Sequence, residues 1–249
     1  MDSFGSTAAI VVVVFALAGV VKGMIGLGLP TIAMGLLTLA MPPAAAASLL
    51  VVPSLVTNVW QLVRGPAFGT LARRLWALLA GIVVGTFAGG LPSLVHAAPW
   101  TRVALGAVVA LYGAWGLAAA RLPAPGRRER WLSPLVGYLT GAVTAATGVF
   151  VIPAVPYLQA LRLDKEQLVQ ALGLSFTVST LALAAQLAFT SGWQPVDVGM
   201  SVLALVPALA GMAGGTVLRK VVSESTFRRV FFAGLVALGL YMAVGPAQG

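Results

Sequence analysis

Eight apolar segments, separated by short polar stretches, follow one another along the chain. Six of them have about the 20 residues that one helix needs to cross a bilayer, and two are too long for one simple helix. This pattern predicts an all-α, polytopic membrane protein. The predicted segments are 7–41, 44–63, 75–95, 102–120, 132–161, 168–190, 198–217 and 230–246.

Both long segments are interrupted near the middle by glycine and proline. The first interruption runs from Lys22 to Pro30 and contains three glycines. The second runs from Thr144 to Pro153 and again places a glycine, Gly148, shortly before a proline. Since glycine and proline disfavour a continuous helix, each long segment should be broken. The broken segment then either returns as a hairpin or spans the membrane twice.

The two interruptions are related by a constant shift along the sequence. A shift of 122 positions places Gly19 on Gly141 and Gly26 on Gly148, and the correspondence continues into the next apolar segment. The chain therefore reads as a duplication with four apolar segments in each half. The predicted parts are a first repeat at 1–120, a basic linker at 121–131 and a second repeat at 132–249.

The loop charges indicate that the two repeats enter the membrane in opposite senses. Arg64, Arg73 and Arg74 lie between the second and third segments of the first half, whereas the matching loop at 191–197 has no basic residue. Basic loops face the cytoplasm, so an inverted pair of repeats, each with an odd number of crossings, is expected. Inverted repeats with broken helices are typical of secondary transporters, whose site lies at the midplane between the repeats.

Composition favours lipid over water as the solvent of this fold. Of the 249 residues, 59% are hydrophobic and 8% are charged, whereas a soluble domain has about 25% charged residues. The net charge of +9 comes mainly from the short loops, which argues against nucleic-acid binding. The sequence has no cysteine, which excludes disulfides and thiolate metal sites.

Lys22 is the charged residue that lies in the interior of an apolar segment. A lysine at that depth costs at least about 2.5 kcal/mol, unless its long side chain reaches the interface. Beside backbone amides released at a helix break, its ammonium would form a cradle for an anion. The residues predicted to line this site at the two interruptions are Lys22, Gly23, Gly26, Gly28, Thr144, Thr147 and Gly148.

Polar side chains also recur at helical spacing in the second segment of each half. One interpretation is hydrogen bonding between neighbouring helices. Because two matching stripes accompany two matching breaks, we expect them to line the transport pathway. These substrate-binding candidates are Ser54, Asn58 and Gln61 in the first half, and Ser175, Thr177 and Ser179 in the second.

Two rows of glycines at four-residue spacing have a different interpretation. Small residues four apart let helices approach closely, so we assign these rows to helix packing. The rows are Gly81-Gly85-Gly89 and Gly211-Gly215.

Enzymatic chemistry has little support in the sequence. No pair of carboxylates lies within an apolar segment, which argues against a buried metal site or an intramembrane protease. Walker A and Gly-x-Ser-x-Gly motifs are absent. We therefore expect a protein that is not an enzyme and needs no cofactor.

The interruptions resemble the signatures of a known family. Residues 19–30, Gly-Val-Val-Lys-Gly-Met-Ile-Gly-Leu-Gly-Leu-Pro, are followed by Gly-Leu-Leu at 35–37 and are similar to the first signature of the TauE/SafE sulfite exporters. This family is also called the 4-toluene sulfonate uptake permease family. Residues 141–153, with Pro-Tyr-Leu at 156–158, resemble the second signature. The resemblance covers nearly the whole chain.

The resemblance implies export or uptake of sulfite, sulfonates and related small organic anions. The sequence departs from the family at Gly26-Leu27-Gly28, where many members have three consecutive glycines. It also has Val149-Phe150-Val151 where glycines are common. These departures concern the particular substrate and leave the architecture unchanged.

Together, the residues and the resemblance predict a multi-pass secondary transporter of the bacterial inner membrane that exports a small anion by alternating access. A potential that is negative inside favours anion exit by about 2.3 kcal/mol per charge per 100 mV. The alternatives are an importer that couples the same anions to H⁺ or Na⁺, and a non-transporting accessory subunit. The expected partners are the anion, the lipid bilayer and, for an importer, the coupling ion; a homodimer is compatible with the sequence.

Overall fold

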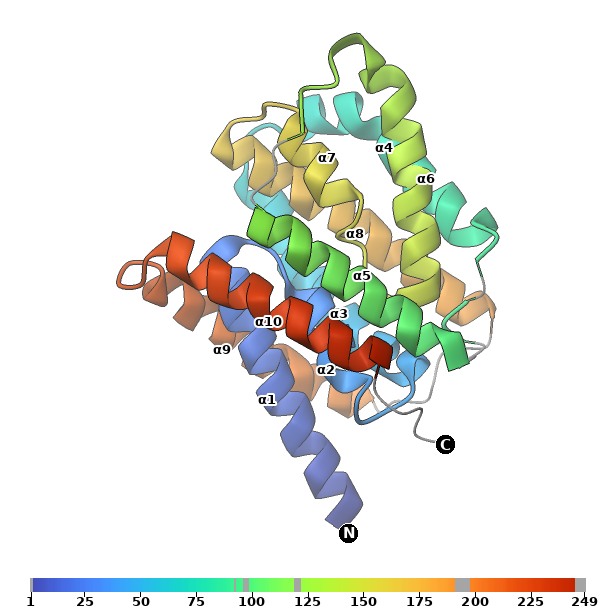
Figure 1. Ribbon diagram of the computed structural model, residues 1–249. Coiled ribbons are helices and arrows are strands. Elements are labelled where there is room, and N and C mark those ends of the chain that lie inside the picture. The colour runs from blue at the N-terminus through green and yellow to red at the C-terminus, as the bar shows by residue number, and fades with distance from the viewer. Residues whose placement is uncertain (1, 92, 96–98, 119–121, 191–197, 245–249) are drawn as a thin grey trace. The chain divides into compact units, whose positions relative to one another are not determined.

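The computed structural model describes residues 2–91, 93–95, 99–118, 122–190 and 198–244 (Figure 1). Arg121 of the predicted linker and the loop at 191–197 lie outside these residues. Every regular element in the described part of the chain is a helix. The elements are α1 (Asp2–Ile25), α2 (Leu29–Leu37), α3 (Pro43–Arg64), α4 (Phe68–Ala88), α5 (Pro99–Ala118), the 3₁₀ helix η1 (Gly126–Arg128), α6 (Glu129–Thr147), α7 (Ala154–Ala160), α8 (Lys165–Phe189), α9 (Val198–Leu218) and α10 (Glu224–Val244).

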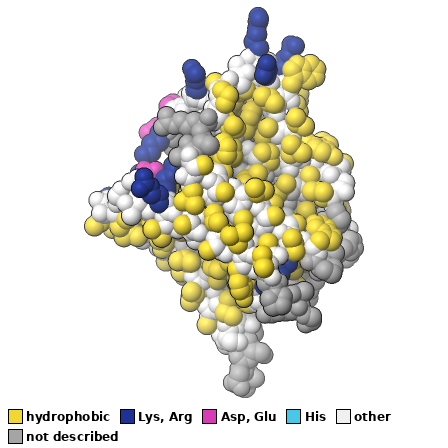
Figure 2. Space-filling model, viewed as in Figure 1, with side chains coloured by type: hydrophobic (Ala, Val, Ile, Leu, Met, Phe, Trp, Pro, Cys, Tyr) yellow, Lys and Arg dark blue, Asp and Glu magenta, His cyan; other side chains and the backbone are white. Residues whose placement is uncertain are grey.

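Seven helices in the described residues are long and apolar enough to cross a membrane, namely α1, α3, α4, α5, α8, α9 and α10. Their outer faces carry large apolar side chains such as Val13, Leu111 and Phe189, which are 66%, 63% and 81% exposed. Figure 2 shows a surface dominated by hydrophobic side chains, with lysine and arginine gathered in a few places. Since such a surface is unfavourable in water, the prediction of an all-α, polytopic membrane protein is confirmed.

Both predicted interruptions are breaks in the helices. The first break separates α1 from α2 and contains Gly28, at a φ of +99°. The second separates α6 from α7 and begins at Gly148, at a φ of +71°. Only glycine adopts this left-handed conformation without strain, so α6 ends before Gly148 and α1 ends before Gly26, whose φ is +76°. The short helices α2 and α7 pack on the helices that precede them.

Several helices begin earlier than the apolar pattern predicts. α4 begins at Phe68 rather than at 75, and α10 begins at Glu224 rather than at 230. The second turns of both helices carry arginines, whose long side chains keep the charge at the interface while the backbone stays helical. α8 begins at Lys165 because the Asp164 carboxylate caps it and accepts a hydrogen bond of 2.8 Å from the Gln167 amide.

The chain divides into two compact units, and each contains helices from both predicted repeats. Unit 1 comprises Met1–Pro53, Ala97–Ala120 and Trp193–Gly249, and unit 2 comprises Ser54–His96 and Arg121–Gly192. The boundary between the first parts of the two units falls inside α3. Packing therefore intermixes the halves of the sequence, while the duplication itself stays a prediction.

In unit 1, α1 packs against α9 and α5 packs against α10. The first pair meets through glycines on both helices. A Cβ atom at Gly215 would lie 2.1 Å from the Val20 carbonyl oxygen, and one at Gly19 would lie 2.2 Å from the Ala208 carbonyl oxygen. Because these distances exclude any side chain, the prediction that the Gly211-Gly215 row serves helix packing is confirmed.

In unit 2, the corresponding close pair is α4 with α6. A Cβ at Gly85 would overlap the Tyr138 carbonyl oxygen, and one at Gly141 would lie 2.1 Å from the Ile82 carbonyl oxygen. Gly81 and Gly89 meet α6 in the same way. The packing role predicted for the Gly81-Gly85-Gly89 row is therefore confirmed as well.

Gln170 of α8 fastens the connection between α3 and α4. Its Nε2 donates hydrogen bonds to the carbonyl oxygens of Leu62 and Gly65, at 2.8 and 2.6 Å. Its Oε1 accepts a bond of 2.8 Å from the Ala67 amide. Three groups that follow or end a helix are thus satisfied by one buried side chain.

We expect Gln170→Leu to lower the free energy of unfolding by about 2 kcal/mol. Three hydrogen bonds are lost, each contributing about 1 kcal/mol, and water at the loop restores part of them. Thermal unfolding in detergent measures the change. Gln167→Leu, one turn earlier on α8, is the control, since its backbone amide and not its side chain makes the hydrogen bond with Asp164. Equal losses in the two variants would contradict the assignment.

Candidate functional site

Lys22 lies in the last turn of α1, next to the first break, and its side chain is only 3% exposed. The ammonium therefore does not reach the protein surface by snorkelling. A cation near a helix C-terminus gains about 0.3–1 kcal/mol from the helix dipole, which is less than the roughly 2.5 kcal/mol that a membrane-embedded lysine costs. Helix stabilisation alone does not account for a lysine here.

The three glycines predicted beside Lys22 have separate places. Gly23 lies inside α1, where a Cβ would be 2.2 Å from the Met212 carbonyl oxygen of α9. The Gly26 amide donates a hydrogen bond of 2.8 Å to the Lys22 carbonyl oxygen. Gly28 precedes α2, and its carbonyl oxygen accepts a bond of 2.9 Å from the Ile32 amide. Gly23 thus allows close packing, and the Gly26 amide is already used within the helix end.

The second break is held by side chains of α6. The hydroxyl groups of Thr144 and Thr147 each donate a bond of 2.7 Å to the carbonyl oxygen four residues earlier. The Gly148 amide donates to the Thr144 carbonyl oxygen at 2.8 Å. The Val149 amide donates to the Thr147 hydroxyl oxygen at 3.2 Å. The donors predicted at this break are therefore committed to the end of α6.

A buried polar network joins α3 and α8 in unit 2. The Asn58 Nδ2 donates to the hydroxyl oxygen of Ser54 at 3.0 Å and to that of Thr180 at 3.4 Å. The hydroxyl groups of Ser54 and Thr180 are 3.1 Å apart, and Thr180 donates to the Phe176 carbonyl oxygen. Gln61, one turn further along α3, is 9% exposed. Hydrogen bonding between helices, one of the two interpretations of these stripes, thus occurs at Ser54 and Asn58.

Ser175 and Ser179 differ from their neighbours on α8. Both side chains are fully buried, and neither hydroxyl group has a hydrogen-bond partner among the described residues. Thr177, between them, donates to the Gly173 carbonyl oxygen of its own helix. An unsatisfied buried polar group costs about 1–3 kcal/mol, so two of them one helical turn apart make this face of α8 a candidate for ligand binding.

The structure thus brings the Ser54 and Ser175 stripes together with the second break in unit 2, while Lys22 and the first break belong to unit 1. Thr180, which was not among the predicted site residues, connects the two stripes. A signal for it was present, since the shift of 122 that relates the repeats places Asn58 on Thr180.

Comparison with known proteins identifies one family over most of the chain. No curated protein and no solved structure matches. The family described as sulfite exporter TauE/SafE matches residues 11–242, a range that includes both breaks, both polar stripes and both glycine rows. Members of this family are multi-pass membrane transporters, not enzymes. The chain therefore belongs to the TauE/SafE sulfite exporter family.

Proposed function

We propose that this protein exports a small anion, either sulfite, an organosulfonate or a related organic acid, across the bacterial inner membrane. Family membership supports the substrate class. The observation that carries the proposal is the pair of buried hydroxyl groups at Ser175 and Ser179, which have no partner among the described residues. They lie on α8, a helix long and apolar enough to span the membrane.

The chemistry of the serine pair suits an oxyanion. Sulfite and sulfonate oxygens are hydrogen-bond acceptors, and hydroxyl groups one turn apart can donate to two oxygens of one such group. The threonines at the second break already donate to carbonyl oxygens, so they shape the site rather than bind the anion. Binding would remove the cost of leaving two buried hydroxyl groups unsatisfied.

Lys22 would provide the attraction for a negative charge. Its burial keeps the ammonium away from bulk water, where its field would be screened. Potential-driven exit then needs no buried proton carrier. The role of Lys22 as an anion-attracting residue is part of the proposal, as are those of Gly26, Gly28 and Gly148 in shaping the breaks, whereas Gly23 serves the packing of α1 on α9.

We further propose alternating access by two inverted repeats. Packing supports this: the first long helix of each half pairs with the fourth helix of the other half, as α1 with α9 and α6 with α4. α5 pairs with α10, the last helix of each half. Asn58 and Thr180, which the repeat shift superposes, are hydrogen bonded to each other, as expected near a pseudo-twofold axis.

Flux measurements on liposomes test the proposal. We expect the wild-type protein to release sulfite or a short sulfonate from loaded liposomes down its concentration gradient. Release should be faster when the membrane potential is negative inside the liposome. Ser175→Ala/Ser179→Ala should lower the flux at least tenfold, because a hydrogen bond to a charged group contributes about 1.5–3 kcal/mol.

Ser48→Ala is the matched control for the serine pair. Ser48 is also a buried serine on a long helix, but its hydroxyl donates to the Ala44 carbonyl oxygen at 2.9 Å. Unchanged flux in the double variant would show that the serines do not bind the anion. Uptake that requires a pH or sodium gradient would favour the coupled importer over the exporter. Absence of flux for every anion tested would favour the accessory subunit.

A further inference from the structure

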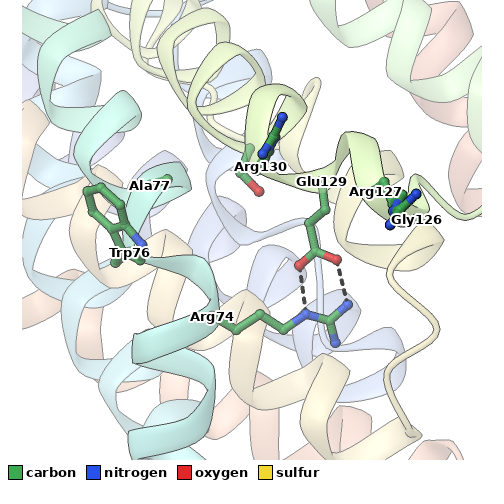
Figure 3. A pocket seen from close by; sticks show the side chains of 8 residues that line it. Arg74, Trp76, Ala77, Gly126, Arg127, Glu129 and Arg130 are labelled. Carbon is green, nitrogen blue, oxygen red and sulfur yellow. Dashed lines mark hydrogen bonds and ion pairs between the residues drawn. The ribbon is translucent and has the colours of Figure 1, made fainter.

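A pocket of about 370 Å³ lies at the surface of unit 2, between the start of α6, the preceding η1 and the first half of α4 (Figure 3). Its lining includes Arg74 and Trp76 of α4, Arg127 of η1, and Glu129 and Arg130 of α6. The residues of α4 and those of the linker region are some 50 positions apart in sequence, so the fold rather than a single loop builds the pocket.

The charges of the pocket do not balance. Glu129 is used by Arg74, which donates to both of its carboxylate oxygens at 2.7 and 2.9 Å. Arg127 has no ion-pair partner among the described residues, and the contact shown for Arg130 is with the Trp131 ring, 5.4 Å from its centroid. Three arginines against one glutamate leave an excess charge of +2. A bound anion would balance this excess positive charge.

Exposed aromatic and apolar side chains lie in the pocket and on the neighbouring surface of α6. Trp76, which lines the pocket, is 65% exposed, and Trp131, next to Arg130 in the sequence, is 70% exposed. Leu135, one turn after Trp131, is 52% exposed. Tryptophan and apolar side chains beside basic residues at helix ends are typical of the interface between headgroups and acyl chains. The anion that suits this surface therefore carries hydrocarbon chains.

We propose that this pocket binds the phosphate of an anionic phospholipid, such as phosphatidylglycerol, in the leaflet that faces the cytoplasm. Arg127 and Arg130 bind the phosphate, and Arg74, which Glu129 and the Leu161 carbonyl oxygen hold in place, presents its Nη1 donors to it. Trp76 packs against the glycerol and the first acyl carbons. The basic loops place this end of unit 2 on the cytoplasmic side. The lipid site is separate from the transport site and does not depend on it.

Native mass spectrometry of the delipidated full-length protein tests the proposal. With added phosphatidylglycerol, we expect one lipid to bind more tightly than any phosphatidylcholine. Arg127→Ala/Arg130→Ala should weaken this binding about 30-fold, since each basic side chain near an anionic headgroup contributes about fivefold. Both arginines are exposed and make no ion pair among the described residues, so the variant should keep its melting temperature without lipid.

Arg219→Ala/Lys220→Ala is the matched control, because it removes two exposed basic side chains of the turn that follows α9. This control should bind phosphatidylglycerol like the wild type. Equal affinity of the Arg127/Arg130 variant and the wild type would overturn the proposal, as would equal binding of phosphatidylglycerol and phosphatidylcholine. Inorganic phosphate is a second probe: competition at equal concentration would show a site for a soluble anion and would overturn the lipid assignment.

Discussion

Sulfite flux through liposomes should fall more than 100-fold when Lys22 is replaced by methionine. The substitution keeps the length and apolar stem of the side chain and removes its charge. Two unit charges 4 Å apart attract by about 4 kcal/mol at the effective dielectric constant of a protein, so an anion that depends on Lys22 loses most of its affinity. Because Lys22 is buried, no water or salt replaces the missing charge. Radiolabelled or fluorescently detected efflux measures the result.

Stability and charge controls separate a transport role of Lys22 from a structural one. The melting temperature of Lys22→Met in detergent should stay within about 4 °C of the wild type, a change of about 1 kcal/mol. Lys22→Arg, which keeps the charge, should retain part of the flux. Lys220→Met, at an exposed lysine, should transport normally. A loss of flux that merely follows a loss of folded protein would show that Lys22 supports the fold alone.

Gly215→Val should lower the free energy of unfolding by about 3 kcal/mol, and the melting temperature by about 10 °C. Any Cβ at this position would lie 2.1 Å from the Val20 carbonyl oxygen and 3.0 Å from the Val20 Cα, so α9 and α1 must separate. Rigid backbone, rather than a flexible side chain, is the obstacle. Contacts along the whole helix pair are then loosened together.

Gly214→Val provides a control in the same helix, one residue away. A Cβ at Gly214 would have no atom within 4 Å, so it would point into lipid. This variant should unfold like the wild type or slightly later. Similar losses in the two variants would mean that α9 tolerates no change in helix composition, and close packing at Gly215 would then not be the cause.

The sequence predicted the positions at which the backbone departs from a helix, because these depend on local chemistry. Gly28 and Gly148 adopt the left-handed conformation that other residues avoid, so their effect does not depend on what surrounds them. The packing role of the glycine rows was also predictable from the sequence, since small residues at four-residue spacing in a membrane helix allow a neighbouring helix to approach closely.

Other features depend on contacts that a single sequence does not reveal. Gln170 was visible only as one more polar residue near a helix start, and its three partners lie more than 100 positions away. From the sequence, Ser175 and Thr177 were both predicted to bind substrate. In the structure, the Thr177 hydroxyl donates to a carbonyl oxygen of its own helix, whereas the Ser175 hydroxyl has no partner among the described residues. The sequence does not reveal which hydroxyl bonds to its own helix.

The intermixed packing of the two halves has a consequence for synthesis. α9, the partner of α1, begins 173 residues after α1 ends (198 minus 25). At about 5–20 residues per second, α1 waits about 10–35 seconds in the membrane before its glycine face can be covered. During that interval, lipid or the insertion machinery must cover the surface of α1 that lacks side chains at Gly19 and Gly23. Assembly of this transporter is therefore completed by its last third, and a ribosome that stalls before α9 leaves a chain in which the glycine face of α1 is uncovered.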